Sequence, residues 1–334
     1  MQTGNVRIAD MHCDTISEIL KHKRLGEDCS LRSNSLHVDL ERMQAGGYLI
    51  QNFALFVQTR KCEMTPWEEV CALYEVYKQE LLVNEDILAP VLVYEDIERN
   101  QREGKLSALL TVEEGAVCGG ETEKLHKLYD MGVRMMTLTW NFENELGWPN
   151  INLEGKVDLY RPDSTHGLTS KGKEFVEVMN ELGMIVDVSH MSDAGFYDVL
   201  ECSKKPFVAS HSNARTICGC VRNLTDDMIR RLAEQGGCMG LNFCADFLEQ
   251  MPAGVKNPGT IAAVVRHARH IVNVGGVEVL GLGSDFDGID THEELPGAQS
   301  MVLLWEALHK SGFTQRELEK IFAGNVLRVY REIL

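Results

Sequence analysis

The sequence predicts an α/β fold in which eight parallel strands, each followed by a helix, close into a (β/α)₈ or TIM barrel. First, short β-rich apolar runs alternate with helical patterns, as in parallel β/α units. Second, no domain-sized boundary interrupts this alternation, so residues 1–334 are expected to form one domain. Third, the runs number eight. We expect strands at Val6–Asp14, Tyr48–Val57, Ala108–Glu113, Arg134–Trp140, Met184–His190, Pro206–His211, Cys238–Phe243 and Val277–Asp285.

Several linkers between these runs have the pattern of amphipathic helices. Thr169 is expected to cap a helix that Gly183 ends directly before the next strand. Between them, apolar residues recur at the spacing of one helical face, namely Phe175, Val178, Met179 and Leu182. The linkers before Gly132 and Gly236 repeat this form. His37-Val-Asp39 follows a polar loop and is interpreted as the start of another helix.

An open doubly wound sheet is the alternative fold. It is disfavoured because no glycine-rich phosphate loop follows the first run. One long irregular stretch, Asn141–His166, follows the fourth run. Because it leaves the carboxyl end of a strand, it is expected to overhang the mouth of the barrel. We interpret it either as a substrate lid or as a plain surface insertion.

The composition restricts the partners and the compartment. A net charge of −17, with no run of Lys or Arg, disfavours nucleic acid and anionic membranes, which both require a basic patch. No stretch approaches the roughly 20 apolar residues that span a bilayer, and no signal peptide's apolar stretch precedes His12. A cytoplasmic protein is expected, with a homodimer as one candidate assembly. The ten cysteines contain no Cys-x-x-Cys pair and are interpreted as buried thiols.

Ionisable residues stand at the ends of five of the eight runs. Because the carboxyl ends of barrel strands meet at one face, these residues are expected to converge there. His12 and Asp14 are expected on the same side of the first strand, since side chains alternate with a period of two. His190 and His211 end neighbouring runs and can reach a common ion through imidazole nitrogens. Two such pairs favour a site for divalent metal ions.

Acidic residues end two further runs, with Glu113-Glu114 after the third and Asp285-Phe-Asp287 after the eighth. A glutamate between two half-sites can bridge two divalent ions with its two oxygens. Open positions then remain for a shared water, whose pKa falls to about 7 on zinc. Because Glu113 and Glu114 are adjacent, only one can face the mouth, and periodicity alone does not decide which.

These residues resemble the membrane dipeptidase (renal dipeptidase) family of binuclear zinc peptidases over almost the whole chain. The resemblance lies in Asp10-Met-His-Cys-Asp14, Leu110-Thr-Val-Glu113, Gly132-Val-Arg-Met-Met-Thr-Leu-Thr139, Gly183-Met-Ile-Val-Asp-Val-Ser-His190, Ser210-His-Ser-Asn-Ala214, Arg222-Asn223 and Gly283-Ser-Asp-Phe-Asp-Gly288. The Val-Asp-Val-Ser-His and Ser-His-Ser motifs are highly specific together. The resemblance implies a catalytic barrel that hydrolyses dipeptides, including those with a C-terminal D-residue.

The resemblance also implies two zinc ions per chain, with other divalent metals as alternatives. It places His12 and Asp14 on one ion and His190 and His211 on the other. It favours Glu113 as the residue that bridges both. The acid/base aspartate of the family falls on Asp285, whereas Asp287 is expected to be a turn or supporting residue.

Around the substrate, the resemblance places Arg222, which would hold the substrate's carboxylate, together with Asn223 and Trp140. Mammalian members carry a histidine at the position of Trp140, proposed to contact the substrate or the developing oxyanion. Tryptophan donates one hydrogen bond but does not titrate. Trp140 is therefore interpreted either as a substrate contact or as a structural residue.

Other functions are less well supported by the residues. A barrel amidohydrolase such as a deaminase or a cyclic-amide hydrolase usually begins with His-x-His, whereas this chain has His12-x-Asp14. A phosphoesterase would need a cluster of cationic residues for phosphate. A non-catalytic metal- or peptide-binding protein would not need Asp285 beside a full set of ligands.

Overall fold

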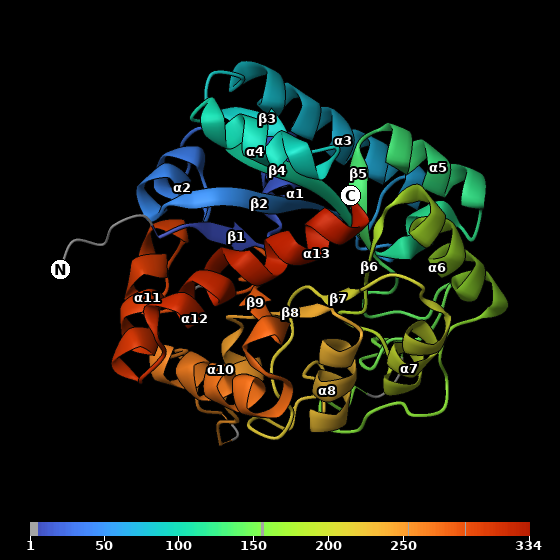
Figure 1. Ribbon diagram of the computed structural model, residues 1–334. Helices are drawn as coiled ribbons and strands as arrows, with labels where there is room; N and C mark the ends of the chain where they lie inside the picture. The colour runs from blue at the N-terminus through green and yellow to red at the C-terminus, as the bar shows by residue number, and fades with distance from the viewer. Residues whose placement is uncertain (1–5, 155–156, 253, 291) are drawn as a thin grey trace.

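The computed structural model describes residues 6–154, 157–252, 254–290 and 292–334, and these contain nine parallel strands (Figure 1). The strands are β1 Ile8–Asp10, β2 Tyr48–Phe56, β3 Leu88–Pro90, β4 Leu106–Glu113, β5 Val133–Thr137, β6 Ile185–Asp187, β7 Val208–Ala209, β8 Cys238–Leu241 and β9 Leu280–Leu282. Eight of them close a barrel in the order β1-β2-β4-β5-β6-β7-β8-β9, because β2 pairs with β4 and β9 pairs back onto β1. The predicted (β/α)₈ barrel is confirmed.

The strands differ from the prediction in number and length. The unpredicted β3 pairs with the start of β4 outside the barrel, and it ends at Pro90, which suits an edge strand. Three residues are too few to produce a recognisable periodicity. The barrel strands are also mostly shorter than predicted, since β1 ends at Asp10 and β7 contains only Val208 and Ala209. The ionisable residues expected at strand ends therefore lie mostly in the loops just beyond them.

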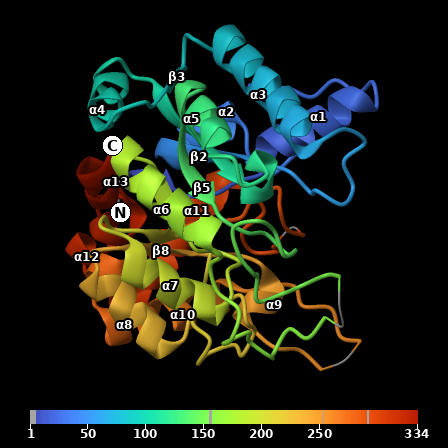
Figure 2. The same ribbon diagram turned by 90° about the vertical axis from the view of Figure 1, so that its right-hand side faces the viewer.

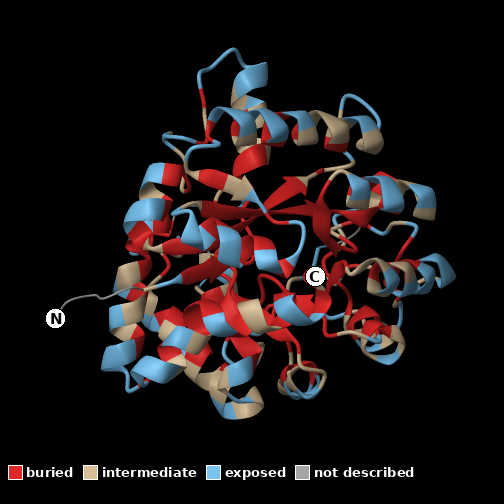
Figure 3. Cartoon of the chain, turned by 45° about the horizontal axis from the view of Figure 1, so that its top comes forward, coloured by how far each residue is buried: buried red, intermediate tan, exposed pale blue. Residues whose placement is uncertain are grey.

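Helices surround the barrel, with their outer faces exposed and the strands buried (Figure 3). They are α1 Thr15–Arg24, α2 Leu40–Gly46, α3 Pro66–Val83, α4 Tyr94–Arg102, α5 Thr122–Asp130, α6 Ser170–Leu182, α7 Asp193–Cys202, α8 Asp226–Glu234, α9 Ala245–Leu248, α10 Ile261–Gly275, α11 Met301–Lys310, α12 Gln315–Glu319 and α13 Asn325–Ile333. Short 3₁₀ turns occupy Gly115–Cys118, Val277–Val279 and Ala298–Ser300, and a π-helical turn at Lys320–Gly324 precedes α13. No helix in the described part of the chain is long and apolar enough to cross a membrane.

Helix boundaries follow the capping residues that the sequence predicts. The Thr169 hydroxyl accepts from the Gly172 amide at 3.0 Å, and Gly183 ends α6 with a φ of 74°. Asp39 caps α2 by accepting from the Arg42 amide, so the interpretation of His37-Val-Asp39 as a helix start is confirmed. These local hydrogen bonds satisfy amides that the first helical turn leaves unpaired.

Helix α13 closes one end of the barrel, while α9 and the long stretch after β5 lie at the opposite end (Figures 1 and 2). The apolar residues of α13 pack against inward-facing residues of the strands, namely Ala9, Ile50, Leu109, Met135, Ile185, Val208 and Cys238. The Tyr330 ring is fully buried there, and its hydroxyl donates to Asn52 Oδ1 at 2.9 Å. The floor of the barrel is thus a packed apolar layer that includes the polar contact of Tyr330 with Asn52.

This floor predicts a stability difference between two substitutions. Tyr330→Ala should lower the free energy of unfolding by about 3–5 kcal/mol, because it removes a large ring from a closed cluster. Tyr330→Phe removes only the hydrogen bond to Asn52 and should cost about 1–2 kcal/mol. Urea denaturation followed by circular dichroism would measure both. Equal losses would mean that packing of the ring contributes little.

Candidate metal centre

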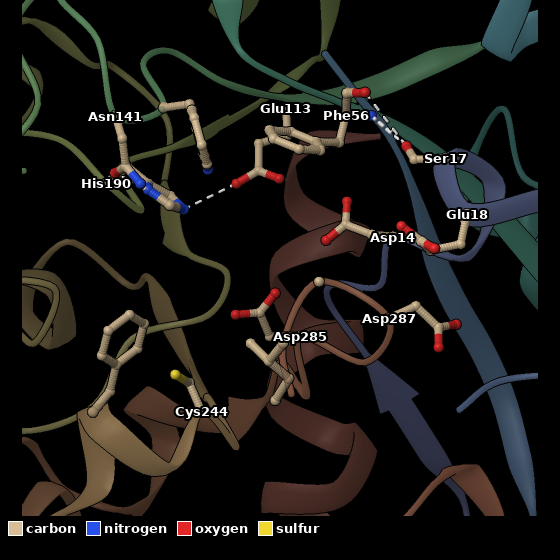
Figure 4. A pocket seen from close by; sticks show the side chains of 14 residues that line it. Asp14, Ser17, Glu18, Phe56, Glu113, Asn141, His190, Cys244, Asp285 and Asp287 are labelled. Atoms are coloured by element: carbon tan, nitrogen blue, oxygen red, sulfur yellow. Dashed lines mark hydrogen bonds and ion pairs between the residues drawn. The ribbon is translucent and has the colours of Figure 1, made fainter. Parts of the chain in front are cut away.

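A cavity of about 310 Å³ lies at the carboxyl ends of the barrel strands (Figure 4). Its wall combines carboxylates, a histidine and apolar side chains from segments far apart in the sequence. The lining residues are Asp14, Ser17, Glu18, Phe56, Glu113, Trp140, Asn141, His190, Cys244, Phe247, Asp285, Asp287, Gly288 and Ile289. This volume is at the lower limit of ordinary small-molecule sites.

His12 and Asp14 lie together at one side of the cavity. The distance from His12 Nε2 to Asp14 Oδ2 is 3.4 Å, and both side chains are buried. The sequence argument assumed a strand through Asp14, but β1 ends at Asp10 and Asp14 is the N-cap residue of α1. The two side chains therefore meet at a strand–helix junction, not through the alternation of a regular strand. His12 Nδ1, His12 Nε2 and Asp14 Oδ1 have no hydrogen-bond partner.

His190 and His211 form a second pair from the loops that follow the neighbouring strands β6 and β7. Their Nε2 atoms lie 3.0 Å apart. The opposite nitrogens are held, because His190 Nδ1 contacts Asn141 Oδ1 at 2.8 Å and His211 Nδ1 contacts Ser210 Oγ at 2.8 Å. An amide oxygen can only accept, so the His190 Nδ1 carries the proton.

The same assignment follows for His211. The Ser210 hydroxyl donates to the Asp187 carboxylate at 2.6 Å, so it accepts from His211 Nδ1. Both rings then direct Nε2 lone pairs into the site. Burial and the charge of Arg222 lower the pKa of His190 to about 4. Burial and the charges of His12 and Arg222 lower the pKa of His211 well below its ordinary value.

Two neutral imidazoles with facing lone pairs fit a cation. Acceptor nitrogens 3.0 Å apart repel each other, and neither ring holds a second proton near pH 7. A divalent ion that accepts both lone pairs removes this repulsion. Hydrogen bonds to the other ring nitrogens are the usual means by which proteins orient metal-binding histidines.

Glu113 lies between the two pairs. Its Oε1 is 2.9 Å from His190 Nε2 and 3.6 Å from His211 Nε2, while its Oε2 is 3.4 Å from His12 Nε2. Burial opposes ionisation of this carboxyl, but the charge of His12 lowers its pKa below the ordinary value. One oxygen thus faces each half of the site, which is the geometry of a bridging carboxylate.

The tertiary structure separates Glu113 from Glu114. On β4, Leu109 belongs to the cluster around α13, whereas Leu110 and Val112 belong to the layer beneath the outer helices. By alternation Glu113 shares the inner face with Leu109. Glu114 has a φ of 95° and accepts from the Ala116 and Trp140 amides. Glu114 therefore supports the loop after β5, outside the metal centre.

The side chains form three overlapping candidate metal sites. His12, Asp14 and Glu113 make one, and Glu113, His190 and His211 make another. Asp285 joins His12 and His211 in the third. In each group the potential ligand atoms lie within 4.8 Å of one another. Buried imidazole and carboxylate donors in two groups that share one glutamate suit a pair of divalent ions.

Asp285 lies at the edge of this cluster, in the loop that follows β9. Its Oδ2 accepts from Asn242 Nδ2 at 2.8 Å, and its Oδ1 is 3.9 Å from His12 Nε2. Burial raises the pKa of Asp285 to about 7, against the lowering effect of His12. Gly288 allows the close approach of this loop, since a Cβ there would meet Asp14 Oδ2 at 2.1 Å and Asp285 Oδ1 at 2.6 Å.

Asp287 lines the cavity, but its oxygens are engaged elsewhere. Oδ2 accepts from the Thr15 hydroxyl and Oδ1 from the His37 amide, each at 2.6 Å. Its backbone has a φ of 69°, which a turn requires. These contacts agree with the supporting role that the sequence analysis expects, and they attach the loop after β9 to α1.

Arg222 lies behind the wall of the cavity and does not line it. Its side chain is 3% exposed, packs 5.5 Å from the Phe247 ring and donates to the His211 carbonyl at 3.4 Å. Its Nε has no partner, and within the described ranges no carboxylate forms an ion pair with it. Burying a guanidinium without a counter-ion is costly, so this position favours an anionic ligand.

Of the two other expected substrate residues, Trp140 lines the cavity and Asn223 does not. Trp140 lines the cavity and packs between Phe56 and Phe142, with ring centroids 5.0 and 5.6 Å away. Asn223 is fully buried and outside the cavity wall. Its amide donates to the Cys218 and Phe247 carbonyls, so we omit Asn223 from the substrate site.

Several residues of the site escaped the sequence analysis. Asn141 and Asn242 orient His190 and Asp285 through single hydrogen bonds. No pattern in the sequence marks them, because their roles depend on which loops meet. Ser210 and Gly288 stand inside recognised motifs, so their positions could have suggested a role.

Comparisons with known proteins place this geometry in context. A family model described as membrane dipeptidase (peptidase family M19) matches residues 3–334. An uncharacterized protein from the pqqA 5′ region of Klebsiella pneumoniae is 35% identical over 240 residues, 71% of this chain and 86% of that protein. An uncharacterized dipeptidase of Schizosaccharomyces pombe is 31% identical over 314 residues, 89% of this chain and 72% of that protein.

A solved structure has the same fold. The crystal structure of the metallopeptidase named dipeptidase AC matches with a TM-score of 0.87 and 25% identity. The match covers 98% of this chain and 99% of that one. The fold of almost the whole chain therefore has a counterpart in a metallopeptidase.

The difference between the adjacent glutamates generates a prediction on metal content. Glu113→Gln should weaken binding at both halves of the site, because one carboxylate faces both. Glu114→Gln is the matched control and should leave the metal content nearly unchanged. Elemental analysis by mass spectrometry after dialysis against zinc would measure both. The reverse order of losses would assign the bridging role to Glu114.

Proposed function

The chain belongs to the membrane dipeptidase family, peptidase family M19, and on this basis we propose that it uses two zinc ions per chain to hydrolyse dipeptides. Members of this family are metal-dependent dipeptidases. The observation that carries the two-ion proposal is the position of Glu113, which directs one oxygen at each of two groups of buried ligands.

In this proposal His12 and Asp14 hold one ion, His190 and His211 hold the other, and Glu113 contacts both. Mixed nitrogen and oxygen ligands favour zinc over magnesium or calcium, which prefer oxygen alone. When bound, such a pair lowers the pKa of a water molecule and withdraws charge from the substrate carbonyl. The oriented neutral imidazoles support this assignment.

Asp285 is the proposed acid and base. It accepts the proton of the attacking water and passes it to the nitrogen of the leaving amine. Its position beside the ligand cluster suits a group that takes a proton from the attacking water and returns it to the leaving amine. Asn242 fixes one carboxylate oxygen and leaves the other directed toward the ligand cluster.

Arg222 is proposed to bind the substrate's C-terminal carboxylate. A guanidinium offers two parallel donors that match a carboxylate, whereas an internal peptide presents a neutral carbonyl. Its burial without a counter-ion supports this role. Substrates would then end one residue beyond the scissile bond. We extend the proposal to dipeptides with a C-terminal D-residue, which the family resemblance implies.

We also propose that the protein works in the cytoplasm. Its ten cysteines are free thiols. A reducing compartment keeps thiols in this state.

Asp285→Asn should separate proton transfer from metal binding. The substitution keeps the size of the side chain but removes the proton acceptor, so kcat should fall by roughly 10²–10⁴ while zinc stays bound. Steady-state kinetics and elemental analysis of the same preparation would test this. A parallel loss of zinc would make Asp285 primarily a ligand, as its grouping with His12 and His211 allows.

Arg222→Met should reduce kcat/KM for dipeptides by about 30- to 1,000-fold with metal content unchanged, because a charge-assisted contact of roughly 2–4 kcal/mol is lost. Amidation of the substrate's C-terminus should cost the wild type a similar factor and the variant much less. Kinetics with both substrates form a double-mutant cycle. Additive losses would mean that Arg222 does not contact the carboxylate.

A further inference from the structure

We propose that Glu18 binds the α-ammonium group of the substrate's first residue and so makes a free N-terminus part of the specificity. The inference rests on the proposed dipeptidase function and adds a second recognition point to it. It follows from the carboxylates of the cavity, from the position of Glu18 on α1 and from the weakness of its present ion pair.

Glu18 is the one carboxylate of the described cavity wall that the proposed chemistry leaves unused. Five carboxylates line the cavity. Asp14 and Glu113 are proposed ligands, and Asp285 is the proposed acid and base. Asp287 is occupied by Thr15 and the His37 amide. No lysine or arginine is among the described lining residues, so the wall offers no cationic side chain that would repel an ammonium group.

The position of Glu18 corresponds to the acyl end of the substrate. The Glu18 amide donates to the Asp14 carbonyl at 3.1 Å, so the two residues lie one helical turn apart on the same face of α1. Figure 4 shows Glu18 beside Asp14 and across the cavity from His190. Arg222 lies behind the wall that His190 and Phe247 form.

The charges at the two ends of a dipeptide then determine how the substrate lies in the cavity. Its ammonium and carboxylate groups stand on opposite sides of the scissile bond. If Arg222 holds the carboxylate at the His190 side, the ammonium group points toward Asp14 and Glu18. A carboxylate at that place binds ammonium with a charge-assisted hydrogen bond.

The present partner of Glu18 can be displaced. Lys21 Nζ contacts both Glu18 oxygens, at 3.0 and 2.9 Å, but the Lys21 side chain is 63% exposed. Exposed pairs of this kind contribute little free energy, so Lys21 can return to solvent when a substrate arrives. Glu18 also borders a groove of about 650 Å³ that shares Ser17 and Phe56 with the cavity. This groove offers room for the side chain of the first residue.

The test compares an alanyl dipeptide with its N-acetyl form, both with a free carboxylate, in the zinc-loaded enzyme. The wild type should prefer the free amine. Glu18→Gln should lower kcat/KM for the free dipeptide by about 10- to 100-fold and leave the N-acetyl substrate nearly unchanged, because only the charged contact is lost. Lys21→Met should raise kcat/KM for the free dipeptide a few-fold, since it removes the competing cation.

Glu63→Gln is the matched control, because Glu63 lines only the groove and is exposed; it should stay within about twofold of the wild type. Zinc content of every variant is measured alongside. Equal losses of Glu18→Gln on both substrates, no loss on either, or loss of zinc would overturn the role of Glu18 while dipeptide hydrolysis by the wild type stands. A zinc-loaded wild type that hydrolyses no dipeptide would overturn the proposed function and this inference with it.

Discussion

The other residues of the site are arranged around two neutral imidazoles, His190 and His211, whose Nε2 atoms lie 3.0 Å apart. Asn141 and Ser210 hold the far nitrogens of His190 and His211, so neither ring is free to turn its lone pair away. Such a pair of acceptors fits a shared cation, because the hydrogen bonds to the far nitrogens direct both lone pairs at one point. The centre is therefore preorganised for metal, which is the condition for tight binding with little rearrangement.

The backbone of the loops around the centre is strained at four residues. Within the described part of the chain, the non-glycine residues with positive φ are Glu114, His190, Asp285 and Asp287. All four stand in loops that follow barrel strands at the site. Each such conformation costs on the order of 1–3 kcal/mol. The barrel and its sealed floor supply the rigidity that holds these loops, so stability at one end supports function at the other.

The distribution of charge gives the cavity a direction. Asp14 and Glu18 line it on the side of α1, while the guanidinium of Arg222 lies buried beyond the wall at His190 and Phe247. A zwitterionic dipeptide has the same asymmetry along its length. Recognition of both ends would limit the proposed metal pair, which could hydrolyse many amides, to short substrates. The limit then comes from charge at the two ends and not from the volume of the cavity alone.

The sequence by itself determined the barrel, the order of its elements and the histidines and carboxylates that converge, because each is marked locally by an apolar run followed by a polar residue. Only the tertiary structure showed that Glu113 points inward and Glu114 outward. Only it showed that Asn223 lies outside the cavity wall. The contact of Asn242 with Asp285 joins residues 43 positions apart. Such contacts depend on the register and curvature of neighbouring strands, which fix where side chains meet, and a single strand's pattern does not contain that information.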